Sequence, residues 1–382
     1  MKIVVAPNAF KGSMSAACAA AAMAEGIRRV LPDVHIDQVP VADGGDGLVE
    51  VALDALRGER CRLLVTGPRF DLVEAEFCHV PEQSFAAIEM ALASGLALLP
   101  DNLRDPMQTT TLGTGELILA ALDLGVNRIG VGIGGSATCD GGIGMATALG
   151  VRFLDAAGRS VSPVGGALRN IVHIDPSGLD PRITETTVEA VCDVDNPLVG
   201  EHGAARLYGP QKGADPEQVE QLESGLDNLA RVIKADLGLD LCNLPGAGAG
   251  GGLGAGLHAF LGAALRPGVD VVLDLVGLDK KLEGSDLVLT GEGQIDFQTV
   301  FGKAPAGVAQ RAKKKKIPCI VVAGSVGEDL GELHKQGVDA VFSLCSGPMS
   351  LQEAMQQAEI SIARSTEQIL RCFLAGQRSG IL

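Results

Sequence analysis

Short apolar runs alternate with helix-patterned segments in the first part of the chain. β-branched residues at 2–6 and at 36–41 predict two strands, and the alanine-rich segment between them predicts a helix capped by Ser13 or Ser15. A second helix is expected at 48–57. Strands and helices in this order indicate parallel strands joined by right-handed crossovers, with ligands at the carboxyl ends of the strands.

The same alternation returns near the end of the chain. Strands are expected at 287–290, 319–323 and 340–344, and helices after Lys303, at 330–336 and at 351–373. The middle is less regular, although a strand at 188–191 and helices ending near 124 and 237 stand out. We therefore predict an α/β fold of two domains. One is built from 1–72 and 282–382, and a second α/β domain with glycine-rich loops is inserted at 73–281.

A glycine-rich loop follows one predicted strand in the middle of the chain. Ile129, Val131 and Ile133 alternate with glycines as a buried strand can, and a helix is expected from Met145. The loop between them, 134–142, presents backbone N–H groups and the hydroxyls of Ser136 and Thr138, which suits a phosphate. Asp140 in the same loop suits a magnesium ion bridging phosphates. A tight turn with a capping aspartate is the alternative interpretation.

Acidic residues recur in the loops after predicted strands, and three lysines lie in similar loops. The acidic residues are Asp43, Asp46, Asp140, Asp193, Asp195, Glu292 and Asp296, and the lysines are Lys11, Lys212 and Lys303. Each acidic residue taken singly is explained as a cap or turn residue. Taken together, the residues indicate a site for phosphate and magnesium. Phosphoryl transfer needs positioning, charge neutralisation and a carboxylate near the attacking hydroxyl.

Composition narrows the classes of partner. The chain has 382 residues, 51 glycines, no Trp and one Tyr, which is typical of a loop-rich α/β enzyme. Its formal net charge of −16 argues against nucleic acid and anionic membranes as partners. The nine cysteines include no CxxC pair, and the start of the chain reads as a strand rather than a signal peptide. We expect a cytoplasmic location; the oligomeric state stays open, with a homodimer as one option.

Other nucleotide motifs are weaker. The lysine at Gly302-Lys303-Ala304 lacks the context of a Walker A loop. The run 246–251 fits GxGxxG, with Asp270 or Asp274 at a distance suited to a ribose, but residues 238–244 make a poor strand before it. A NAD-dependent oxidoreductase of a small hydroxy acid is therefore kept as an alternative function, and a non-catalytic metabolite-binding regulator as another.

Six blocks in order resemble the glycerate kinase type 1 family. They are APNAFKGS from Ala6, ADGGDG from Ala42, GIGGSAT from Gly132 with Asp140-Gly141-Gly142, CDVDNPL from Cys192, GPQKGA from Gly209, and TGEG from Thr290 with Asp296, Gln298, Thr299, Gly302 and Lys303. Cys139 stands where the family more often has Asn. The resemblance implies two α/β domains, one of them discontinuous and Rossmann- or flavodoxin-like. It also implies ATP-dependent phosphorylation of D-glycerate to 2-phosphoglycerate.

The resemblance also suggests roles for particular residues. We expect Gly134, Gly135, Ser136 and Thr138 to contact the phosphates of ATP, with Asp140 either as a magnesium residue or as a residue that supports the groups around the ion. Lys11 and Ser13 would receive the carboxylate or phosphate of the substrate.

Lys212 and Lys303 are expected to serve as further clamps for anions. Asp193 is the favoured base at the glycerate 2-hydroxyl, with Asp43 and Asp296 as close alternatives. Full deprotonation is unnecessary, because the carboxylate need only accept the proton as the new bond forms.

Overall fold

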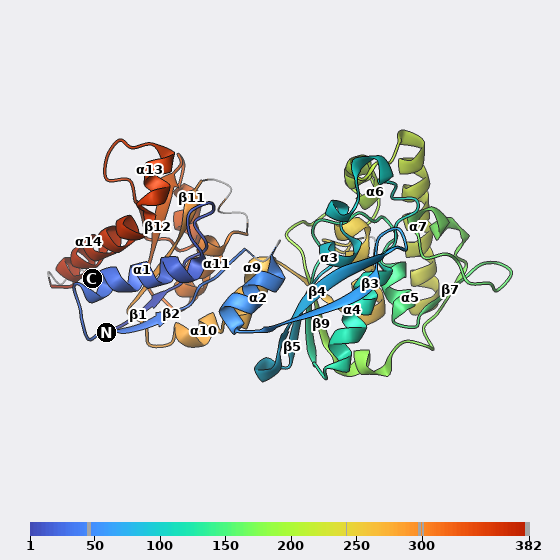
Figure 1. Ribbon diagram of the computed structural model, residues 1–382, viewed down its shortest axis with the longest axis horizontal. Coiled ribbons are helices and arrows are strands. Elements are labelled where there is room, and N and C mark those ends of the chain that lie inside the picture. Colours follow the sequence, from blue (N-terminus) through green and yellow to red (C-terminus); the bar gives the residue numbers. More distant parts are fainter. Residues whose placement is uncertain (44–46, 242, 297–298, 300–301, 379–382) are drawn as a thin grey trace. The chain divides into compact units, whose positions relative to one another are not determined.

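The computed structural model describes residues 1–43, 47–241, 243–296, 299 and 302–378 (Figure 1). The chain divides into two compact units. Unit 1 comprises Met1–Asp43, Asp54–Leu56 and Val269–Leu382, and unit 2 comprises Gly44–Leu53 and Arg57–Gly268. Unit 1 thus combines both ends of the chain, and unit 2 is inserted between them.

The sheet of unit 1 is parallel throughout its described strands. Its order is β13-β12-β11-β1-β2. The strands are β1 (Lys2–Val5), β2 (His35–Gln38), β11 (Leu287–Ile295), β12 (Cys319–Val326) and β13 (Ala340–Ser343). The short apolar runs predicted from the sequence are confirmed as strands, and three of them, β1, β11 and β12, supply buried residues to a sheet covered on both faces.

Helices cover both faces of this sheet. They are α1 (Ala16–Arg28), α10 (Leu278–Lys281), α11 (Ala304–Lys314), α12 (Gly331–Gln336), α13 (Leu351–Gln356) and α14 (Ala358–Arg378), with α9 (Gly268–Leu275) entering from unit 2. Ile3 and Val5 of β1 share a core with α1 and α14, whereas Val4 belongs to the core that contains α11. Figure 1 shows α1 and α14 side by side. The cap of α1 is Ser15, which accepts from the Cys18 amide.

Two elements of unit 1 differ from the prediction. The loop expected at 291–296 is still strand as far as Ile295, because these residues pair with β12 up to Val326. The single helix expected at 351–373 is two helices. Ser350 starts α13 with a reciprocal capping box to Glu353, and α13 ends at Gln356 before α14 begins.

Unit 2 is organised on a mixed sheet of order β10-β9-β6-β5-β4-β3. The strands are β3 (Glu59–Thr66), β4 (Leu72–Val80), β5 (Phe85–Glu89), β6 (Arg128–Gly132), β9 (Thr187–Val191) and β10 (Ala264–Arg266). Strands β5, β6, β9 and β10 are parallel, and β3 and β4 are antiparallel additions. A small hairpin joins β7 (Arg152–Leu154) to β8 (His173–Asp175). The sequence did not indicate β3 to β5.

The helices of unit 2 bury one continuous apolar core with this sheet. They are α3 (Ala91–Ser94), α4 (Leu112–Asp123), α5 (Ile143–Ala148), α6 (Ala204–Tyr208), α7 (Pro216–Leu237) and α8 (Leu253–Leu261), whereas α2 (Leu48–Leu56) contributes no residue to this core. Helix α2 starts within unit 2 and ends in residues assigned to unit 1. Strand β3, which the sequence-based division placed in the first domain, pairs with β4 in this sheet. None of the helices in the described part of the chain combines the length and the hydropathy of a membrane-spanning segment.

Candidate active site

The glycine-rich loop of unit 2 lies where the sequence placed it, between β6 and α5. Gly134 and Gly135 are exposed, whereas Ser136 and Thr138 are buried. Gly135 has a φ of 68°, a conformation that side chains rarely adopt. The loop therefore exposes backbone at its beginning and buries its two hydroxyl groups behind it.

Asp140 organises the rest of this loop. Its Oδ2 accepts from the amide and the hydroxyl of Thr111, both at 2.8 Å, and from the Gly144 amide at 3.2 Å. Its Oδ1 accepts from the Gly142 amide at 3.1 Å. Burial raises the pKa of Asp140, and these hydrogen bonds act in the opposite direction. The carboxylate therefore caps the first turn of α5 and ties it to the start of α4.

Lys212 is the least expected feature of this loop. It ends a short 3-10 turn, Pro210–Lys212, and is only 2% exposed. Its Nζ donates to Ser136 Oγ and to the Thr138 carbonyl, both at 2.7 Å. Burial lowers the pKa of Lys212, while Cys139 and Asp140 raise it. The ammonium thus makes its hydrogen bonds to two neutral oxygens, while Asp140 is held by other donors.

Thr138 adds an unpaired group beside this lysine. Its Oγ1 is buried and has no hydrogen-bond partner within the described structure. An unpaired buried hydroxyl lowers the stability of the folded protein by about 1 to 3 kcal/mol. The Thr138 hydroxyl is therefore destabilising unless a ligand supplies a partner. The buried cation that donates to this loop and the unpaired hydroxyl within it both favour a bound anion.

The second glycine run supports this loop from behind. A Cβ on Gly251 would lie 1.9 Å from the Thr138 carbonyl oxygen, and one on Gly256 would lie 2.6 Å from that of Gly141. The Gly141 amide also donates to the Gly251 carbonyl at 3.1 Å. The run is therefore required for close backbone packing. The described residues of 238–244 contain no strand, so the dinucleotide motif lacks its expected context.

Asp193 lies at the same edge of the unit 2 sheet. Strand β9 ends at Val191 and pairs with β6, whose end leads into the glycine loop. Asp193 is exposed, and its Oδ1 accepts from the Gly268 amide at the start of α9, at 2.8 Å. The neighbouring strands thus bring Asp193 to the edge that carries Gly134.

Unit 1 carries a second group of predicted residues at the carboxyl edge of its own sheet. Asp43, in the segment after β2, accepts from Asn8 Nδ2 at 3.0 Å and from the Ala304 amide at 2.8 Å. Asn8 follows β1, and Ala304 is the first residue of α11. One carboxylate oxygen therefore joins three distant segments of the sequence. The sequence did not single out Asn8.

Glu292, Asp296 and Lys303 lie together beside Asp43. Lys303 Nζ is 4.0 Å from both Glu292 Oε1 and Asp296 Oδ1. The Thr299 hydroxyl donates to Glu292 Oε1 at 3.3 Å and accepts from the Asp296 amide at 3.1 Å. Burial raises the pKa of Glu292 to about 7; Lys303 lowers it, and Asp43 and Asp296 raise it. Glu292 was noted among the acidic loops but was given no role.

The two remaining predicted residues follow β1. Lys11 is exposed, and its backbone passes close to β11, since a Cβ on Gly293 would lie 3.5 Å from the Lys11 nitrogen. The Ser13 hydroxyl donates to the Met355 carbonyl at 2.9 Å. Ser13 is therefore engaged within unit 1.

The structure thus assembles the predicted residues in two groups. Unit 2 holds Gly134, Gly135, Ser136, Thr138, Asp140, Lys212 and Asp193, and unit 1 holds Lys11, Ser13, Asp43, Asp296 and Lys303. Asp46 and Gln298 lie outside the described residues. No trio of His, Cys, Asp or Glu side chains able to hold a metal ion is found among the described residues.

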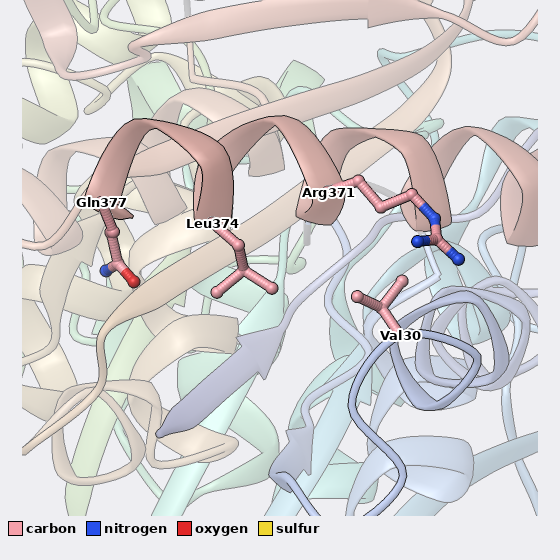
Figure 2. Close-up of a pocket in the computed structure, with 4 residues that line it drawn as sticks. All are labelled: Val30, Arg371, Leu374 and Gln377. Atoms are coloured by element: carbon pink, nitrogen blue, oxygen red, sulfur yellow. The ribbon is translucent and has the colours of Figure 1, made fainter. Parts of the chain in front are cut away.

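A pocket of about 550 Å³ in unit 1 is separate from these groups. It is lined by Val30, Arg371, Leu374 and Gln377 (Figure 2). Figure 2 shows the three side chains of α14 on the face that meets Val30, just past the end of α1. Val30 precedes β2, so this pocket lies toward the amino edge of the sheet, away from Asp43 and Glu292. Ligands of such sheets bind at the opposite edge.

Comparison with known proteins identifies the family. The pattern of the Glycerate kinase family matches residues 3–374, almost the whole chain. The chain belongs to the glycerate kinase family. A glycerate kinase of Halalkalibacterium halodurans is 49% identical over 96% of this chain and 97% of its own length. A protein of Escherichia coli named glycerate 2-kinase is 46% identical over 99% of this chain and 100% of its own.

A solved structure supports the same assignment. The crystal structure assigned as glycerate kinase 2 from Salmonella typhimurium aligns with a TM-score of 0.88 and 45% identity, covering 99% of both chains. The resemblance stated from the six sequence blocks is confirmed, as is the α/β fold class. As a glycerate kinase the chain is a phosphotransferase, and the family implies ATP as the phosphoryl donor. These matches give no support to the oxidoreductase or to the non-catalytic regulator.

Proposed function

We propose that this glycerate kinase transfers the γ-phosphoryl group of ATP, with Mg²⁺, to the 2-hydroxyl of D-glycerate. The products are 2-phosphoglycerate and ADP. The choice of hydroxyl is supported by the E. coli relative that is named glycerate 2-kinase and matches over its full length. A homodimeric state and a cytoplasmic location stay predictions.

The buried Lys212 is the observation that carries the nucleotide part of this proposal. A buried ammonium whose hydrogen bonds among the described residues both go to neutral oxygens is costly in the free protein. A phosphate beside it would offset that cost and would also give the Thr138 hydroxyl an acceptor. Gly134, Gly135 and Ser136 would then add backbone and hydroxyl donors. The residues of this loop therefore fit the phosphates of ATP.

The unit 1 residues fit an anionic acceptor substrate. Lys11 and Lys303 supply positive charge, and Ser13 supplies a hydroxyl once its bond to Met355 is exchanged. The sequence favours Asp193 as the carboxylate at the glycerate hydroxyl, with Asp43 and Asp296 as alternatives. Glycerate presents both a carboxylate and hydroxyls, so a mixed set of lysines and carboxylates suits it.

Magnesium is proposed on chemical grounds. Asp140 was predicted as a metal residue, but four donors of its own unit already occupy its oxygens. We therefore propose that Asp140 holds the loop in shape. The ion neutralises phosphate charge when it is bound, and Lys212 would contribute to that neutralisation at the glycine loop.

Steady-state kinetics of Lys212→Met tests the nucleotide site. The purified protein is given ATP, Mg²⁺ and D-glycerate, and ADP is measured by a coupled assay. Loss of charged hydrogen bonds to phosphate should raise the KM for ATP roughly 10- to 100-fold. The matched control is Lys314→Met, which removes an exposed lysine near the end of α11. A KM for ATP within twofold of wild type in a folded Lys212→Met protein would remove Lys212 from the nucleotide site.

A further inference from the structure

Glu292 is the most deeply buried carboxylate of the unit 1 group, and the proposed function leaves it unused. It is 6% exposed, whereas Asp43 and Asp296 are partly exposed. It lies on β11, the central strand of its sheet, close to the carboxyl end. Ligands of parallel sheets bind at this edge. A buried carboxylate in that position is a candidate for chemistry rather than for solubility.

The two oxygens of Glu292 have different surroundings. Oε1 accepts from the Thr299 hydroxyl at 3.3 Å and lies 4.0 Å from Lys303 Nζ. Within the described part of the chain, no donor reaches Oε2. Thr299 is itself fixed by the Asp296 amide. The carboxylate is therefore held through one oxygen, and the other is left to accept a proton.

The other carboxylates are less suited to that role. Asp43 Oδ1 already accepts from Asn8 and Ala304 and fixes the start of α11. Asp296 accepts from Gln294 Nε2 at 3.1 Å and has a further interaction. Asp193, in unit 2, accepts from the Gly268 amide. Asp43, Asp296 and Asp193 each accept at least one hydrogen bond that fixes a neighbouring segment of the protein.

We propose that Glu292 is the catalytic carboxylate that takes the proton of the acceptor hydroxyl in the glycerate kinase reaction. This inference rests on the proposed function. As the substrate oxygen bonds to the γ-phosphorus of ATP, the bond from that phosphorus to the bridging oxygen breaks and its electron pair leaves with ADP. The hydroxyl proton passes to Glu292 Oε2 and is later released to water. Thr299 and Lys303 keep the carboxylate in place.

The charge environment supports this assignment. The titratable groups facing Glu292 among the described residues are Lys303 of the α11 start, Asp43 of the segment after β2 and Asp296 of the end of β11. Burial and the two aspartates raise the pKa of Glu292 to about 7. A base works best when its pKa is near the working pH. Glu292 is thus a stronger base than an exposed carboxylate and is still ionised in a large fraction of molecules.

The pH profile of Glu292→Gln tests the inference. In wild type, kcat at saturating ATP, Mg²⁺ and D-glycerate should fall about tenfold per pH unit below roughly pH 7, because the base must be ionised. Glu292→Gln should lower kcat roughly 10²- to 10⁴-fold and lose this acid limb, with the KM for D-glycerate little changed. The control is Glu332→Gln, an exposed residue of α12, which should leave the profile unchanged.

Several outcomes would overturn the inference. A Glu292→Gln protein with kcat within threefold of wild type, or with the acid limb intact, would exclude Glu292 as the proton acceptor. A raised KM with normal kcat would make it a positioning residue for Lys303. If circular dichroism shows that Glu292→Gln does not fold, the test is repeated with Glu292→Asp. The shorter side chain displaces the carboxylate, so kcat of this variant should be at least about tenfold lower than that of wild type. Wild type that yields no phosphoglycerate would contradict the proposed function itself.

Discussion

Three buried ionisable side chains show how this protein handles charge at the scale of single residues. Asp140 is surrounded by hydrogen-bond donors, so its charge is compensated within its own unit. Lys212 donates to neutral oxygens, and Glu292 meets an ammonium only at 4.0 Å. The charges of Lys212 and Glu292 are therefore less well compensated than that of Asp140. Groups of this kind concentrate at functional sites, where a ligand completes their environment.

The raised pKa of Glu292 makes stability depend on pH. The folded protein holds this proton up to about pH 7, whereas an ordinary glutamate loses it near 4.5. Ionisation thus favours unfolding, and the free energy of unfolding should fall by roughly 3 kcal/mol as the pH rises through this window. Denaturant unfolding of wild type and of Glu292→Gln at several pH values measures the difference. If the free energy of unfolding changed with pH in the same way in both proteins, the prediction would be contradicted.

The proposed structural role of Asp140 predicts a loss of stability that does not depend on metal. Asp140→Asn replaces one acceptor oxygen by a donor facing the Thr111 and Gly144 amides, which should lower the free energy of unfolding by roughly 2 to 4 kcal/mol. Urea unfolding with Mg²⁺ and with a chelator measures this loss. A loss seen only with Mg²⁺ present would instead restore the metal role predicted from the sequence.

At the scale of elements, glycines decide which loops can approach each other. Gly251 has a φ of 71°, and its Cβ would meet the Thr138 carbonyl oxygen at 1.9 Å. Gly262 at the end of α8 has a φ of 65° with nothing within 4 Å of its Cβ position. Both glycines adopt a positive φ, but only at Gly251 would a Cβ clash with neighbouring atoms.

This pair allows a matched prediction. Gly251→Ala should lower the free energy of unfolding by about 2 to 4 kcal/mol, from backbone strain together with the clash. Gly262→Ala should cost only the strain, about 1 to 2 kcal/mol. Thermal or urea unfolding compares the two variants. Equal losses would mean that the glycine run does not support the loop as described.

The elements that the sequence predicted well are those that apolar runs define. The strands β1 and β12 and helices α1 and α7 are confirmed within a few residues, because each has a buried face that shows in the pattern. Strand β13 is confirmed as well, although its residues are only partly buried or exposed. Strand β3 was missed because it is an edge strand with a mainly exposed, polar sequence. The extension of β11 was missed because Gly291 and Gly293 resemble a loop, and only pairing with β12 makes them strand.

The candidate site was predicted in part, for a similar reason. The sequence indicated the glycine loop and the acidic loops, because glycine and aspartate in short segments after strands have few other uses. It did not indicate that Lys212 is buried, since a lysine in a short loop between Gln211 and Gly213 resembles a surface residue. Neither the burial of Glu292 nor the contact of Asn8 with Asp43 could be predicted, because the contacts involved join residues that are 7 to 35 positions apart in the chain.

At the scale of the whole molecule, each unit has its own apolar core. The unit 1 cores include β1, α1 and α14, and the unit 2 core includes β6, α4 and α7. A substitution inside one core should therefore first reduce the protection of that unit's amides from hydrogen exchange. Gly26 of α1 offers such a change, since its Cβ would lie 2.2 Å from the Ala363 carbonyl oxygen of α14.

Gly26→Ala should destabilise unit 1 by about 1 to 3 kcal/mol, although alanine is the better helix former. Hydrogen exchange read by mass spectrometry should show faster exchange in α1, α14 and the unit 1 sheet, with β6 and α7 unchanged. Gly331→Ala, at the open start of α12, is the control and should change little. Equal acceleration in both units would show that the chain unfolds as one cooperative block.

The most direct test of the account is the identity of the product. The wild-type protein is incubated with ATP, Mg²⁺ and D-glycerate, and the products are identified by phosphorus NMR against standards. The account predicts stoichiometric ADP and 2-phosphoglycerate, and no transfer when ATP is omitted. Formation of 3-phosphoglycerate would contradict the proposed choice of hydroxyl, and the absence of any phosphoglycerate from folded protein would contradict the function itself.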